Sequence, residues 1–74
     1  MSNATRMTSE IEIAVMIDSV KKLEERMTEF ANKYVTVFNF AEKNAIYNVL
    51  LNINDVDVSL HTLLGDIHEA NTSD

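Results

Sequence analysis

The chain of 74 residues contains no cysteine, no proline and only one glycine. Without cysteine no disulfide can stabilise it, and this composition fits a reducing compartment, so we expect a cytoplasmic protein. No run of 18 apolar residues is present, which excludes a membrane-spanning helix. The N-terminus has no long apolar core either, so it is not a signal peptide. We predict that residues 1–8 are a disordered segment, in which Ser2-Asn3-Ala4 matches the remnant of an expression tag.

Basic residues are scarce, since six Lys and Arg stand against twelve Asp and Glu, for a net charge of −6. Up to residue 40 five basic residues oppose six acidic ones, whereas from residue 41 onward Lys43 alone opposes six acidic residues. Contacts to nucleic-acid backbones need clustered Lys and Arg, so we expect no direct nucleic-acid partner. The acidic second half is compatible with a basic protein partner and with a simple role in solubility.

The sequence does contain two apolar series in which spacings of three and four residues alternate, as in helices that pack along a heptad seam. The first series is Ile13, Met16, Val20, Leu23, Met27, Phe30, Tyr34 and Val37, and the second is Ile46, Val49, Ile53, Val56, Leu60, Leu63, Ile67 and Ala70. Ser9-Glu10-Ile11-Glu12 has the pattern of a capping box at the start of the first helix. We predict one all-α domain over residues 9–70, with helices over about 9–37 and 42–70, and a frayed tail over 71–74.

The two series differ in phase, which requires a break between about residues 38 and 45. In an antiparallel hairpin, the numbers of facing residues add up to a constant. When the first series is paired in reverse order with the second, from Ile13 with Ala70 to Val37 with Ile46, the residue numbers of each of the eight pairs add up to 83. This register leaves a short connection. We therefore predict an antiparallel helical hairpin whose turn is centred near residues 41–42.

Charged residues between the apolar positions support the first helix. Asp18–Lys22 and Glu29–Lys33 have the acid-before-base spacing of helical ion pairs.

Residues 52–59 favour a different path, because Asn52-Ile53-Asn54-Asp55-Val56-Asp57-Val58-Ser59 contains mostly poor helix formers. Several of these residues also fit an N-cap. An alternative is therefore three helices near 9–37, 40–51 and 55–69, with the second helix of the hairpin broken near 52–57.

A further apolar row accompanies the predicted seam. With Ile13 and Ile46 as heptad position a, apolar residues that we predict at an interface occupy the e positions: Ile17, Ala31, Phe38, Leu50 and Leu64. An apolar stripe at a, d and e belongs to a helix with more than one neighbour. Because so short a chain is marginally stable alone, we predict a homodimer that forms a four-helix bundle. The alternative is that this row packs on a third helix of the same chain.

Glu24 and Asp57 occupy the middle e positions of the same flank. The predicted hairpin places these carboxylates side by side, where they repel each other. Three roles fit them: solvated acids, partners for a basic group of another subunit or protein, or ligands of a cation. We include the pair in the predicted interface.

No catalytic or cofactor-binding motif is present. Asp55 to Ser59 with Asp66 matches part of a calcium loop, but Leu60 stands where the loop needs glycine. His61 and His68 lie about 10 Å apart along a helix, too far to share one metal ion. We predict no metal site, no cofactor and no enzymatic activity.

Two functions from different classes fit these features. The first is a small acidic protein–protein interaction module, an adaptor, regulator or inhibitor that acts through helix packing. The second is an acidic decoy that blocks the nucleic-acid site of a basic partner, which requires Asp55, Asp57, Asp66 and Glu69 to line one surface. A third function, direct RNA binding by the hairpin, conflicts with the negative charge.

Overall fold

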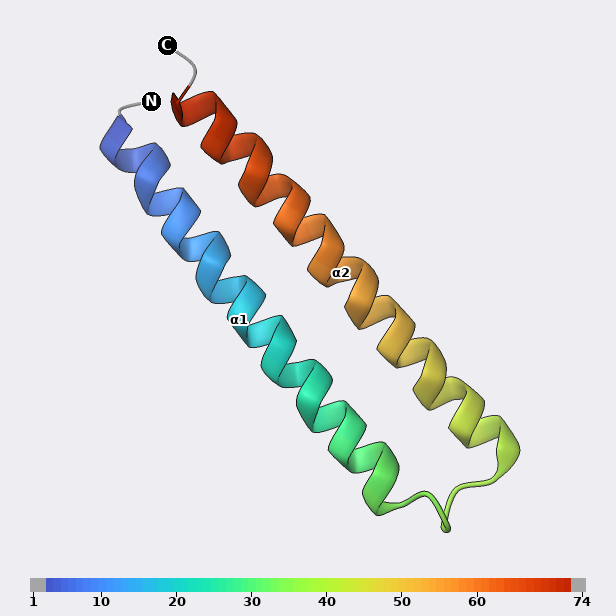
Figure 1. Ribbon diagram of the computed structural model, residues 1–74. Helices are drawn as coiled ribbons and strands as arrows, with labels where there is room; N and C mark the ends of the chain where they lie inside the picture. The colour runs from blue at the N-terminus through green and yellow to red at the C-terminus, as the bar shows by residue number, and fades with distance from the viewer. Residues whose placement is uncertain (1–2, 73–74) are drawn as a thin grey trace.

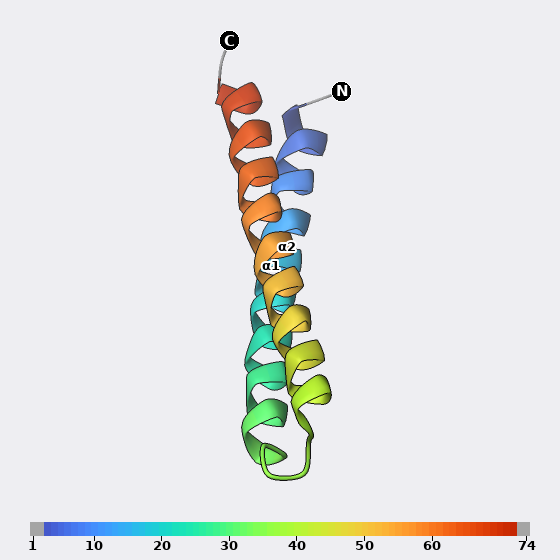
Figure 2. The same cartoon turned by 90° about the vertical axis from the view of Figure 1, so that its right-hand side faces the viewer.

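The computed structural model describes residues 3–72 as two long helices joined by a short loop (Figure 1). Helix α1 spans Asn3–Lys33 and helix α2 spans Phe40–Thr72. The helices pack side by side in opposite directions, so both chain ends lie at one end of a rod of 55 × 15 × 13 Å and the loop lies at the other. In the view turned by 90° they cross at a shallow angle (Figure 2). The predicted all-α helical hairpin is confirmed.

Helix α2 runs without interruption through residues 52–59. The three-helix alternative, with its break near residues 52–57, is therefore wrong. Ile53 is buried and Leu60 is half-buried against α1. These tertiary contacts on both sides of the weak helix formers override their local preference.

Helix α1 begins earlier than predicted, because residues 3–8 form its first turns. Ser9 therefore lies inside the helix, where its hydroxyl donates a hydrogen bond to the Arg6 carbonyl instead of capping a terminus. Helix α2 likewise continues through Asn71 and Thr72, which were predicted to fray. The remaining residues of both predicted disordered ends, 1–2 and 73–74, lie outside the described residues.

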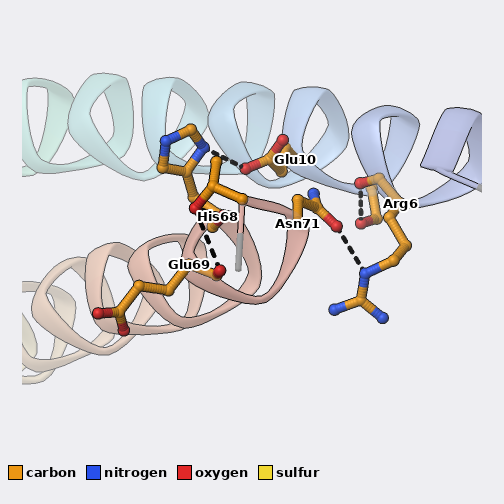
Figure 3. Close-up of polar contacts among 7 residues, drawn as sticks. Arg6, Glu10, His68, Glu69 and Asn71 are labelled. Atoms are coloured by element: carbon orange, nitrogen blue, oxygen red, sulfur yellow. Dashed lines mark hydrogen bonds and ion pairs between the residues drawn. The ribbon is translucent and has the colours of Figure 1, made fainter. Parts of the chain in front are cut away.

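Two polar contacts between the helices hold this end together (Figure 3). Arg6 Nε donates to Asn71 Oδ1 over 2.6 Å, and His68 Nδ1 donates to Glu10 Oε1 over 2.8 Å. The apolar pattern contains no sign of these contacts, which explains why both helices were predicted too short at this end.

Residues 34–39 connect the helices, so the predicted break at 38–45 lies too late in the chain. Asn39 and Glu42 form a capping box at the start of α2. The Glu42 N–H donates to Asn39 Oδ1 over 2.8 Å, and the Asn39 N–H donates to Glu42 Oε1 over 3.0 Å. The box satisfies two backbone N–H groups that have no partner within the helix. It therefore favours a helix that starts at Phe40.

Three aromatic rings close the loop end. The Phe30 ring centre lies 5.2 Å from that of Tyr34 and 5.4 Å from that of Phe38, within the range of attractive ring pairs. Lys33, predicted to pair with Glu29, instead lies over Tyr34 with Nζ 5.3 Å from the ring centre. The rings hold the six-residue loop against the last turn of α1.

The earlier turn changes the register of the hairpin. Arg6 faces Asn71 and Glu10 contacts His68, so facing residue numbers add up to about 77 instead of 83. At this register the a positions of each helix lie level with the e positions of the other. The predicted pairing of a positions with d positions is therefore wrong. In that register residues 38–45 would lie outside both helices, and the capping box between Asn39 and Glu42 would be lost.

The central seam consists of the a and e rows. Its apolar side chains are buried or half-buried: Ile13, Ile17, Val20, Met27, Ala31, Ile46, Leu50, Ile53, Leu60, Leu64 and Ile67. Among the described residues, only the side chains of Ile13 and Ile53 are fully buried, at 7% and 8% exposure. A single hairpin with so little buried apolar surface is marginally stable in water.

Candidate interaction surface

The five apolar residues predicted at an interface lie within the hairpin. Ile17, Ala31, Leu50 and Leu64 are half-buried in the central seam, and Phe38 is half-buried in the ring cluster. The other helix of the same chain accounts for the contacts of the first four. That these residues also contact a second chain stays a prediction.

The d row is the apolar row that the hairpin leaves beside its seam. We call this band the apolar face; its six large side chains remain between 41% and 52% exposed: Met16, Leu23, Phe30, Val49, Val56 and Leu63. The sequence pattern assigned these residues to the seam itself. Because the helices run in opposite directions and pack through rows a and e, the d rows of both helices lie on the same flank.

A groove of about 220 Å³ lies within the apolar face. Its lining residues come from the a and d rows of both helices, together with one residue of row g: Val20, Leu23, Val49, Asn52, Ile53 and Val56. The a-row side chains therefore reach both the central seam and this groove. Such a surface can receive ridges of side chains from another helix pair.

The rim of the apolar face is formed by the g row, which lies next to row d on the outer side of each helix. The rim residues are Glu12, Ser19, Arg26 and Lys33 on α1 and Ala45, Asn52, Ser59 and Asp66 on α2. Two acidic and two basic residues make the rim neutral overall. Within residues 3–72, Glu12, Arg26 and Asp66 take part in no ion pair. These three charged side chains are therefore available for ion pairs with another molecule.

The opposite flank has a different character, and we call it the acidic flank. One groove of about 390 Å³ on it is lined by Ile17, Lys21, Glu24, Asp57 and His61. Glu24 is exposed and Asp57 is half-buried. The two carboxylates thus share a groove with an ammonium group and an imidazole. A functional role for the pair stays a prediction.

Both histidines lie on the acidic flank. His61 Nδ1 donates a hydrogen bond to the Asp57 carbonyl oxygen over 2.8 Å, and it lies 3.5 Å from the Asp57 carboxylate. A carbonyl oxygen only accepts, so the proton is on Nδ1 of the ring. Figure 3 shows the His68 ring turned toward Glu10 of α1, while the Glu69 carboxylate points away from both. Of the two imidazoles only His68 joins the helices, because both contacts of His61 are to Asp57 within α2.

The described residues form no recognisable metal-binding site. Within residues 3–72, no three His, Cys, Asp or Glu side chains lie close enough together to bind a metal. In the same range, neither helix has the continuous apolar stretch that a membrane crossing requires. The absence of enzymatic activity stays a prediction.

One sequence signal, Asn39-Phe40-Ala41-Glu42, would have located the apolar face in advance. It has the capping-box spacing of a polar cap and a glutamate three residues later. A helix starting after Asn39 shortens the connection and shifts the register, which turns the d rows outward.

Comparisons of the chain with known protein families, curated proteins and solved structures give no match. The function is therefore inferred from the surface itself.

Proposed function

We propose that this protein is a small helical protein–protein interaction module whose apolar face packs against a second copy to form a four-helix bundle. The observation that carries the proposal is the exposure of the apolar face. Six large apolar side chains lie half-exposed in one band along both helices. Contiguous apolar surfaces of this kind mark interaction sites in soluble proteins.

The dimensions of the hairpin support a partner of the same size. A face 55 Å long and 15 Å wide has a footprint of roughly 800 Å² per copy, which is about what specific interfaces bury on each partner. Covering six half-exposed side chains contributes about 1 kcal/mol each. The total is comparable with the stability of a small domain, about 5–15 kcal/mol.

The neutral rim also favours a second copy as the occupant. Two copies of a chain with net charge −6 repel each other at long range. The rim of the apolar face carries equal numbers of acidic and basic residues, so it is the flank on which this repulsion is smallest.

Such a dimer acts as a regulator or adaptor by exchanging one copy for a helical segment of another protein. Helical segments bind grooves through apolar residues spaced three and four apart, the spacing that the apolar face itself uses. We extend the proposal to a cytoplasmic location, for which the lack of cysteine is the support.

Two valines of α2 provide a matched test of the proposed face. Val56, 49% exposed, lies on the apolar face, whereas Val58, 56% exposed, points to the other side of the same helix. We expect Val56→Glu to weaken dimerisation at least 100-fold, since a buried carboxylate in the interface is costly. Val58→Glu leaves the dimer intact. Sedimentation equilibrium measures both, starting from an expected mass of twice 8.4 kDa for the parent chain.

Two results would contradict the proposal. One is a parent chain that remains monomeric, and the other is dissociation caused by Val58→Glu but not by Val56→Glu. Circular dichroism of each variant shows whether a loss of mass reflects a lost interface or a lost fold.

The acidic decoy receives less support from the structure. Asp55, Asp66 and Glu69 lie along the outer side of α2, but Asp57 points the other way, into the groove of the acidic flank. Asp55 and Asp66 are eleven residues apart, about 16 Å along the helix, which is wider than the spacing of neighbouring phosphates. A salt-sensitive complex with a basic protein would favour this second function.

A further inference from the structure

We infer that the two copies of the bundle stack in opposite directions, with the loop of each copy over the chain ends of the other. This inference rests on the dimer proposed above. It adds the orientation of the partner, which the charges of the rim select.

Two face-to-face arrangements obey twofold symmetry. In the first, the loops lie at the same end, and α1 of each copy packs against α2 of the other. In the second, the loops lie at opposite ends, and each helix packs against its own counterpart. Both arrangements cover the same apolar residues, so apolar burial alone does not distinguish them.

The same-end arrangement places like charges together. It keeps residues of α1 level with those of α2 that add up to about 77, as in the hairpin itself. Glu12 then lies level with Asp66 of the other copy, and Arg26 lies level with Asn52. Symmetry repeats the repulsive pair of carboxylates, while both arginines stay without an acidic partner.

The opposite-end arrangement places unlike charges together. We place the symmetry axis near the middle of α1, at Ser19, and therefore at Ser59 of α2, which lies level with Ser19, so that the two rods overlap along most of their length. Glu12 and Arg26 are each seven residues from Ser19, so Glu12 of one copy faces Arg26 of the other. Symmetry makes this pair twice, and Asp66 faces the neutral Asn52.

Exposed charge pairs contribute little affinity, but their sign decides between two arrangements that are otherwise equal. The charges of the rim thus determine the relative orientation of the two copies. It also orients the loop and the chain ends of the two copies, so any further partner meets one loop at each end of the dimer.

Charge reversal tests this orientation, because the two arrangements predict changes of opposite sign in the dissociation constant. Glu12→Arg places like charges opposite Arg26 in the opposite-end dimer, and we expect the dissociation constant to rise about tenfold. Adding Arg26→Glu in the same chain restores it. In the same-end dimer, Glu12→Arg instead pairs with Asp66 and tightens association. Glu25→Arg, on the acidic flank side of α1, is the matched control and leaves orientation unaffected.

A distance between the two copies gives a direct reading, and the chain has no cysteine to interfere with labelling. Asn32 is exposed near the loop, thirteen residues from Ser19. With a spin label at Asn32→Cys, opposite-end stacking places the two labels about 40 Å apart, at about 1.5 Å per residue on each side of the axis. Same-end stacking gives a shorter distance, because both labels then lie at one end of the bundle and only its width separates them.

The outcomes separate this inference from the proposed function. A monomeric mass for the labelled chain contradicts the dimer itself. A dimeric mass with the short distance, or tighter association of Glu12→Arg, overturns the orientation and leaves the dimer standing. A dimeric mass with the long distance, together with rescue by the double charge reversal, supports both.

Discussion

The two flanks of the hairpin belong to the same two helices, yet they expose different chemistry. The apolar face presents six large side chains, none less than 41% exposed, inside a neutral rim. In the grooves of the acidic flank, by contrast, charged groups and imidazoles lie among apolar side chains; the titratable lining residues are Glu10, Lys21, Glu24, Asp57, His61 and His68. Removing water from the apolar face is favourable, whereas covering the acidic flank also desolvates charged groups, which costs free energy.

The difference arises from the three apolar rows of each helix. A two-helix hairpin buries only two rows, and here it buries a and e. Row e carries Glu24 and Asp57, whose carboxylates reach water on the acidic flank, where Asp57 keeps 31% of its side chain exposed. Row d carries no charged residue from Met16 to Phe30 on α1 or from Val49 to Leu63 on α2, so the row left outside is uniformly apolar over these stretches. Covering this exposed apolar row with a partner would stabilise the protein.

The largest expected effect comes from the seam that both flanks share. Ile53→Asp buries a carboxylate at the centre of the hairpin and removes one of its two core side chains. We expect a loss of roughly 4 kcal/mol, enough to unfold the chain and erase both flanks. The helical circular dichroism signal measures this loss. Val58→Asp is the control, and a helical Ile53→Asp chain would mean that the seam lies elsewhere.

Removing two carboxylates from the acidic flank should reduce the contrast between the flanks. In Glu24→Leu/Asp57→Leu, two leucines complete row e of the seam, and we expect each to add about 1 kcal/mol of stability. The urea midpoint should rise, and particles larger than a dimer should form because the two carboxylates that disfavour contact on the second flank are gone. A lower midpoint would show that the two carboxylates stabilise the hairpin.

The capping box sets which row faces outward, and its loss has an intermediate effect. Asn39→Ala should cost about 1 kcal/mol, and Glu42→Ala should add little to it, because both side chains serve one reciprocal contact. Urea unfolding of the two single variants and the double variant measures their coupling. Asn44→Ala, one turn further along α2, serves as the control. Fully additive losses would contradict the box.

The smallest effect is expected outside both flanks. The hydrogen bond from Lys22 Nζ to Asp18, 3.0 Å long, raises the pKa of Lys22 above its ordinary value of 10.5, with the Asp18 charge as the next cause. The folded state therefore gains stability below that pH and loses the gain as pH rises through the raised pKa. Asp18→Asn should lower the pKa of Lys22, seen by NMR titration, without changing the dimer mass. An unchanged pKa would contradict the pair.

The sequence predicted the hairpin because heptad spacing reports which side of a helix is apolar. It also predicted the Asp18–Lys22 pair, which needs only local helix geometry. It misplaced the register because a stripe of rows a, d and e fits two different seams equally well. The choice depended on the turn, and the turn depended on Asn39 and Glu42, whose capping contact outweighed the apolar phase.

The positions of the predicted interface residues depend on the same choice of register, and whether they also contact a second chain stays a prediction. Leu50 and Leu64 are as apolar as Leu23 and Leu63, and spacing alone does not say which pair faces the other helix. Only the register of about 77 places the first pair in the seam and the second pair on the apolar face. Polar contacts such as Arg6 with Asn71 were beyond prediction, because they join residues far apart in the chain.

The most direct test of the central claim is the mass of the parent chain in solution. Sedimentation equilibrium between about one and one hundred micromolar should give twice 8.4 kDa at the upper concentrations, with helical content falling as the dimer dissociates on dilution. A chain that sediments at 8.4 kDa throughout this range and stays fully helical would contradict the claim that the apolar face is built for a second copy.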